Sequence, residues 1–110
     1  MAIREVDVEA LHAAMEQGAL VVDVRQPDEY VSGHVPGAVL VPLGEVPGNV
    51  RAFRTEPPGG TVYVICRSGA RSMRACEFVA QHDIDAVNVA GGTLAWVASG
   101  RDVVTGSQAS

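Results

Sequence analysis

The sequence predicts a single α/β domain built on a parallel sheet, and three observations support this fold class. The chain has 110 residues, of which 47% are hydrophobic and 19% charged, enough for one compact core. The runs at residues 19–24 and 61–65 are nearly all apolar, as expected of strands buried on both faces. Segments with helical periodicity alternate with such runs, a pattern that favours a parallel sheet covered by helices on both faces.

The first half of the chain is expected to contain three strands and three helices. The strands are predicted at residues 3–6, the first being a short edge strand, 19–24 and 38–41. The helices are predicted at residues 8–17, from Pro27 over a short stretch, and at 47–53. Asp7 is the expected N-cap of the first helix, and Gly18 ends that helix. Pro27 stands at a first helical position, where proline is favoured.

The second half is expected to contain two strands and two helices. The strands are predicted at residues 61–65 and 86–89, after a turn at 57–60. The helices are predicted at residues 70–82 and from Thr93, as an N-cap, through Ala98. Cys76 faces the core on the longer helix. Residues 1–100 are therefore assigned to the domain, and residues 101–110 to a tail that we expect to be frayed.

Charge and composition narrow the classes of partner. The net charge of −5 argues against nucleic acid or an anionic membrane surface as a partner. No stretch has the apolar core of a signal peptide or the length to span a membrane. The two cysteines form neither a CxxC pair nor a zinc-ligand set, so we expect no metal and no cofactor. A cytoplasmic location, where thiols stay reduced, is the expectation that follows.

Cys66 is the candidate nucleophile. It follows a predicted buried strand and opens the loop Cys66-Arg67-Ser68-Gly69-Ala70-Arg71-Ser72, which leads into the longest predicted helix. A strand-to-helix turn directs backbone N–H groups toward an anion, and this environment lowers the pKa of a thiol. Arg67 and Arg71 add positive charge, and with Arg74 on the following helix they place three of the eight basic residues of an acidic chain close to Cys66. The pattern indicates a thiolate and a small anionic substrate.

Three segments of the chain resemble the rhodanese family of sulfurtransferases. They are VDVR at 22–25 with EY at 29–30 and GHVPGA at 33–38, VICRSGARS at 64–72, and VAGG at 89–92 with Trp96. The resemblance implies one rhodanese-like three-layer domain, with about five parallel strands and helices on both faces. It implies that Cys66 takes the outer sulfur of a donor such as thiosulfate, becomes a persulfide, and passes that sulfur to cyanide or a thiol.

The composition of the loop suits this chemistry. Ser68, Gly69, Ala70 and Ser72 are small, so successive backbone N–H groups can approach an anionic persulfide. Arg67 and Arg71 can hold the sulfonate end of thiosulfate by paired hydrogen bonds.

Three residues outside the loop are interpreted as structural. The resemblance implies that Asp23 and Arg25 support the active-site region, and an Arg25–Glu29 ion pair would join the strand to the next helix. His34 is interpreted as a loop histidine anchored by its own hydrogen bonds.

Two rival functions use the same residues. The domain could carry or sense persulfide for a protein partner with little turnover of its own. Phosphatases and arsenate reductases of the same fold resemble a Cys-x5-Arg loop, whereas Arg71 stands one position earlier and Ser72 occupies the arginine position. The shorter loop suits a sulfur atom better than a phosphoryl group. A small anionic sulfur donor and a thiol or cyanide acceptor are therefore the expected partners, with a protein acceptor as the alternative.

Overall fold

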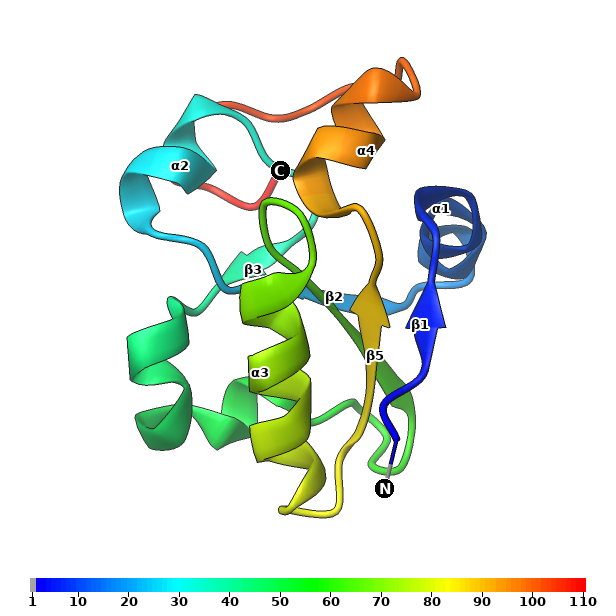
Figure 1. Ribbon diagram of the computed structural model, residues 1–110, viewed down its shortest axis with the longest axis vertical. Helices are drawn as coiled ribbons and strands as arrows, with labels where there is room; N and C mark the ends of the chain where they lie inside the picture. The colour runs from blue at the N-terminus through cyan, green and yellow to red at the C-terminus, as the bar shows by residue number, and fades with distance from the viewer. Residues whose placement is uncertain (1) are drawn as a thin grey trace.

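The computed structural model describes residues 2–110 and contains a five-stranded parallel sheet (Figure 1). The strands are β1 (Glu5–Val6), β2 (Leu20–Asp23), β3 (Val39–Leu40), β4 (Thr61–Ile65) and β5 (Asp85–Val89). Their order across the sheet is β1-β5-β4-β2-β3. β1 is an edge strand, as predicted, and β4 is the central strand. The predicted fold class, an α/β domain on a parallel sheet of about five strands, is confirmed.

The helices lie close to their predicted positions. They are α1 (Val8–Glu16), α2 (Pro27–Ser32), α3 (Ala70–Ala80), α4 (Gly92–Ala98) and two 3₁₀ helices, η1 (Leu43–Gly48) and η2 (Val50–Phe53). Asp7 caps α1 as predicted, because its carboxylate accepts a hydrogen bond of 2.9 Å from the backbone N–H of Ala10. Within residues 2–110, no helix has the length and apolar character that crossing a membrane requires.

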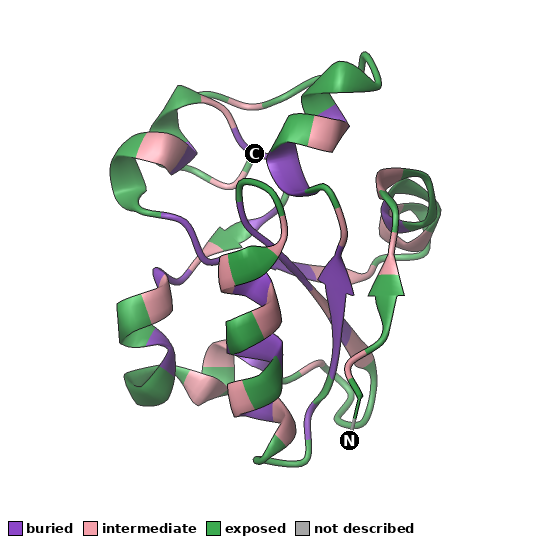
Figure 2. Ribbon diagram, viewed as in Figure 1, coloured by how far each residue is buried: buried purple, intermediate pink, exposed green. Residues whose placement is uncertain are grey.

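The sheet separates two hydrophobic cores, because side chains alternate between its faces. From β4, Val62 and Val64 pack into the core beneath α3 and the 3₁₀ helices. Ile65 of the same strand belongs to the core on the other face, with Leu11 of α1 and Trp96 of α4. Figure 2 shows α3 buried along one side and exposed along the other. Helices therefore cover both faces, as the nearly continuous apolar strands predict.

The helix expected at residues 47–53 is wrong as an α-helix. The segment forms the end of η1 and the whole of η2 instead. Pro47 lies inside η1 and has no N–H to donate, so an α-helical ladder cannot run through it. Val46 and Phe53 nevertheless reach the core, with exposed fractions of 1% and 0%.

The C-terminal segment is bonded to the domain, and the expectation of a frayed tail is wrong. Val104 and His34 exchange two backbone hydrogen bonds of 2.9 Å, and the carbonyl of Ala109 accepts one of 2.8 Å from Gly37 N–H. The His34 ring is fully buried and lies 2.8 Å from the carbonyl oxygen of Tyr30 and 2.9 Å from that of Gln108. His34 is thus anchored by hydrogen bonds, as predicted, and its partners include the tail.

Candidate active site

Cys66 lies directly after the central strand β4, at the carboxyl end of the sheet where ligands of parallel α/β folds bind. Its side chain is buried, with an exposed fraction of 1%. The loop then turns into α3 at Gly69, the N-cap residue, whose φ is +119°. Glycine adopts this conformation without the strain that a side chain would cause. The local sequence thus places the sulfur at the N-terminal end of α3, as predicted.

Hydrogen-bond donors surround the Cys66 sulfur. The backbone N–H of Gly69 lies 3.1 Å from Sγ, and the Ser72 hydroxyl oxygen lies 3.2 Å from it. Burial by itself raises the pKa of this thiol, but the Ser72 hydroxyl and the N–H groups of Ser72, Gly69 and Ser68 outweigh it and lower the pKa below its ordinary value. The arrangement therefore stabilises the thiolate form of Cys66 relative to an ordinary thiol.

Residues in the first turn of α4 donate hydrogen bonds to the backbone of the active-site loop. The backbone N–H and the hydroxyl of Thr93 both donate to the Cys66 carbonyl, at 2.9 and 3.0 Å, and Leu94 N–H donates to the Arg67 carbonyl at 3.1 Å. Thr93 therefore lies inside α4 and does not cap it, contrary to prediction; Gly91 is the N-cap residue. Gly92 permits the contact, since a Cβ there would stand 2.5 Å from the Arg67 carbonyl oxygen.

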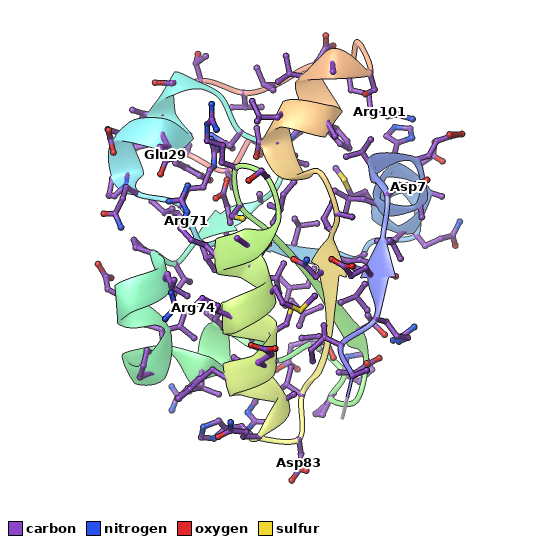
Figure 3. All side chains as sticks on the ribbon, in the orientation of Figure 1. Asp7, Glu29, Arg71, Arg74, Asp83 and Arg101 are labelled. Atoms are coloured by element: carbon purple, nitrogen blue, oxygen red, sulfur yellow. The ribbon has the colours of Figure 1, made fainter. Side chains whose placement is uncertain are left out.

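Arg71 is paired with Glu29 of α2 (Figure 3). Its guanidinium donates to both carboxylate oxygens, at 2.7 and 2.9 Å. The hydrogen bond from Arg71 lowers the pKa of Glu29 to about 2, although burial of the Glu29 carboxyl acts in the opposite direction. The same contact raises the pKa of Arg71. The predicted Arg25–Glu29 ion pair is therefore wrong. Glu29 instead joins α2 to the first turn of α3.

Arg25 forms a buried ion pair with Asp23. Its Nη2 lies 2.8 Å from Asp23 Oδ2 and donates 2.9 Å to the carbonyl of Gly33. Asp23 is fully buried and stands beside Ile65 in the sheet, and the next residue, Val24, donates to the Ile65 carbonyl. The pair thus joins the end of β2, beside the strand that carries Cys66, to the loop after α2.

Arg67 has a different environment from Arg71. It is exposed and forms no hydrogen bond or ion pair through its side chain with any of residues 2–110. It borders a cleft of about 500 Å³ between α2 and α4. The cleft is lined by Arg25, Asp28, Glu29, Ser32, Arg67, Thr93, Leu94, Val97 and Ala98. A larger hollow, about 810 Å³, lies at the opposite end of the strands and contains neither cysteine.

Asn88 of β5 belongs to the site although the sequence analysis did not identify it. It is fully buried, and the Ser72 hydroxyl donates to its Oδ1 over 2.5 Å. Its Nδ2 donates to the carbonyl of Gly69 and to the carboxylate of Glu5 on β1. An available signal was its place as the single polar residue in the strand predicted at residues 86–89, because a buried amide needs partners.

Comparison with known proteins identifies the family. The sequence model of the rhodanese-like domain matches residues 7–99. A sulfurtransferase from Allochromatium vinosum is 34% identical over 105 residues, covering 93% of this chain and 95% of the relative. The thiosulfate sulfurtransferase PspE of Escherichia coli is 37% identical over 71 residues, 64% of this chain and 67% of the relative.

A solved structure agrees with the sequence matches. The crystal structure of a rhodanese-related protein from Thermoplasma volcanium superposes with a TM-score of 0.84 at 28% identity, over 94% of this chain and 99% of that one. The chain therefore belongs to the rhodanese-like domain family, as a rhodanese-family sulfurtransferase.

Proposed function

We propose that this protein transfers sulfane sulfur from thiosulfate, or a similar anionic donor, to cyanide or a thiol through a persulfide on Cys66. One observation carries the proposal: Cys66 Sγ lies at the end of the central strand, with the Gly69 N–H at 3.1 Å and the Ser72 hydroxyl at 3.2 Å. Such a site stabilises a charged sulfur before and after transfer. The name of the Escherichia coli relative, a thiosulfate sulfurtransferase, supports this donor.

The first half of the reaction forms the persulfide. The Cys66 thiolate attacks the outer sulfur of thiosulfate, a new S–S bond forms, and the old bond breaks with its electron pair leaving on sulfite. The two charges of thiosulfate leave with sulfite, and the thiolate charge moves to the outer persulfide sulfur. Exposed Arg67 is placed to bind the sulfonate oxygens and stabilise the departing sulfite.

The second half restores the enzyme. Cyanide or a thiolate attacks the outer sulfur, and the electron pair of the S–S bond returns to Cys66 Sγ. The loop N–H groups between Ser68 and Ser72, with small Ala70, enclose the anionic sulfur between the two halves. Asp23 and Arg25 support the loop by holding the adjacent strand end. We place the reaction in the cytoplasm, where a reactive thiol stays reduced.

A persulfide carrier for a protein partner is the second candidate. The observation that favours it is the bidentate Arg71–Glu29 pair, which leaves Arg67 to bind a small anionic donor without Arg71. Steady-state turnover separates the two functions, because an enzyme turns over repeatedly with thiosulfate and cyanide, whereas a carrier stops after one sulfur. The Arg71–Glu29 pair also argues against a phosphatase, since Arg71 is not free to hold an oxyanion.

The deciding experiment is the intact mass after brief exposure to thiosulfate. We expect wild type to gain one sulfur atom and to lose it on addition of cyanide. Cys66→Ser serves as the negative control and Cys76→Ala as the positive one, because Cys76 is fully buried on α3. Absence of the gain in both wild type and Cys76→Ala, with thiosulfate and with an organic thiosulfonate as donors, would contradict the proposal.

A further inference from the structure

The amide of Asn88 has a fixed orientation behind the active-site loop. Its Nδ2 lies 2.7 Å from Glu5 Oε2 and 3.1 Å from the carbonyl oxygen of Gly69. Both partners are acceptors, so they require the amide nitrogen on that side. The amide oxygen, Oδ1, consequently faces Ser72 and accepts its hydroxyl proton. Asn88 can present only an acceptor to Ser72.

The Ser72 hydroxyl has one proton and two acceptors. Its oxygen lies 2.5 Å from Asn88 Oδ1 and 3.2 Å from Cys66 Sγ. A hydroxyl donates one hydrogen bond at a time and accepts through its lone pairs. With a neutral Cys66 thiol, the S–H can donate to Ser72 while Ser72 donates to Asn88. With a thiolate, the Ser72 proton must turn to Sγ, and Asn88 Oδ1 loses its donor.

We propose that Asn88 is a positioning residue that competes with the Cys66 sulfur for the single proton of Ser72, and so sets how strongly the loop stabilises a charged sulfur. The inference rests on the proposed role of Cys66 as the nucleophile, but not on which donor or acceptor it uses. Asn88 and Ser72 are both fully buried, so within the closed site their polar atoms depend on each other.

This competition suits a sulfur that alternates between two states. In the resting thiolate the charge is on Sγ, and the Ser72 proton stabilises it. In the persulfide the charge is on the outer sulfur, Sγ becomes a weak acceptor, and the Ser72 proton returns to Asn88. Asn88 thereby lowers the cost of moving charge off Sγ. Asn88 Nδ2 also donates to the Gly69 carbonyl. This hydrogen bond holds Gly69, whose N–H group points at the sulfur, in place in both the thiolate and the persulfide.

The charged groups near the loop come from four other places in the fold. They are Asp23 at the end of β2 with Arg25 just after it, Glu29 on α2, Arg71 on α3 and Glu5 on β1. Arg67 is within the loop and exposed, and Cys76 on α3 has its pKa raised to about 12, chiefly by burial. Substituting Asn88 or Ser72 adds or removes no charged group, so the effect of Asn88→Val compared with and without the Ser72 hydroxyl reports the hydroxyl proton.

The test measures the alkylation rate of Cys66 by iodoacetamide across pH, in a Cys76→Ala background where Cys66 is the only thiol. Ser72→Ala should raise the pKa of Cys66 by about one unit or more, since a charge-assisted hydrogen bond is lost. Asn88→Val should lower that pKa by about half a unit to one unit, because Ser72 then donates to the thiolate alone. In the Ser72→Ala background, Asn88→Val should no longer lower the pKa.

Three results would overturn the inference: no shift in Asn88→Val, a shift upward, or the same shift with and without the Ser72 hydroxyl. The last would mean that Asn88 acts only by anchoring Gly69. Asn88→Ala repeats the comparison if the valine variant does not fold, and Asn49→Ala, at an exposed asparagine, is the matched control. Alkylation requires no sulfur donor, so its outcome is independent of the mass experiment that tests the proposed function.

Discussion

Cys66 and Cys76 are both buried, yet their thiols have opposite acid–base behaviour. Burial raises the pKa of Cys76 to about 12, with smaller contributions from neighbouring negative charge. The pKa of Cys66 is lowered although burial acts on it in the same direction, because one hydroxyl and several N–H groups point at its sulfur. Reactivity therefore depends on hydrogen-bond donors more than on exposure. The two arginines of the loop also differ in their surroundings, because Arg67 is exposed and Arg71 is paired with Glu29.

Replacing Arg67 with alanine should impair donor binding. We expect KM for thiosulfate to rise about 10–100-fold with a smaller change in kcat, as for one lost charge-assisted contact. Arg71→Ala should lower kcat as well, because it releases Glu29 and loosens the join between α2 and α3. Steady-state kinetics with thiosulfate and cyanide measure both effects, and Arg74→Ala, at an exposed position on the next turn of α3, is the control. A KM effect confined to Arg71→Ala would show that Arg71 leaves Glu29 to bind the donor.

At the scale of elements, α4 shapes the active-site loop without contributing to the chemistry directly. Its first residues bind the carbonyl oxygens of Cys66 and Arg67, while N–H groups of the same loop face the sulfur. Gly92 makes this contact possible, with φ of +58° and no room for a Cβ against the loop backbone. Gly91, the N-cap, and Gly92, the first residue of α4, thus serve a tight turn and close packing.

Gly92→Ala should therefore damage both stability and reactivity. We expect the free energy of unfolding to fall by about 2–4 kcal/mol, from the left-handed backbone conformation and the clash with the Arg67 carbonyl. Cys66 alkylation should also slow, because the displaced loop no longer aims its donors at Sγ. Urea denaturation and alkylation rates measure these effects. Gly44→Ala is the control, since nothing lies within 4 Å of its added Cβ; equal behaviour of the two variants would contradict the role of Gly92.

At the scale of the whole molecule, the C-terminal segment ties together the loops after α2 and the end of α4. Gly106 N–H donates to the Val31 carbonyl, and the indole N–H of Trp96 donates to the Asp102 carbonyl at 2.8 Å. His34 is hydrogen-bonded to the same segment through its backbone and its ring. None of these bonds involves Gly69 or Ser72, the residues hydrogen-bonded to the Cys66 sulfur.

Removal of residues 101–110 should lower stability and leave the chemistry intact. We expect a loss of about 2–4 kcal/mol in unfolding free energy, from several hydrogen bonds worth about 1 kcal/mol each, partly offset by the entropy regained. Thermal and urea denaturation measure the loss, with removal of Ser110 alone as the control. The pH profile of Cys66 alkylation should be unchanged. A truncated chain as stable as the full one would show that these bonds contribute nothing in solution.

The fold and the position of the nucleophile were predictable because their signals are local. Apolar runs, the Asp7 cap and the small residues after Cys66 act over a few neighbouring positions. The family resemblance also indicated that Asp23 and Arg25 have a supporting role. Local signals were misleading at residues 47–53, where the helical pattern contains Pro47.

The sequence by itself determined the α/β fold and the place of Cys66 at the end of a buried strand, which the sheet order shows to be the central one. Only the tertiary structure decided which side chains meet. Arg67 and Arg71 both lie in the short loop that Cys66 opens, yet one is exposed and the other pairs with Glu29, 42 residues earlier. Asn88 contacts Ser72 only because folding places β5 beside the active-site loop. The tail contacts His34 only because the chain end folds back onto the loop after α2. Hydrogen bonds and ion pairs extend only a few ångströms, so they depend on spatial position rather than on spacing in the sequence.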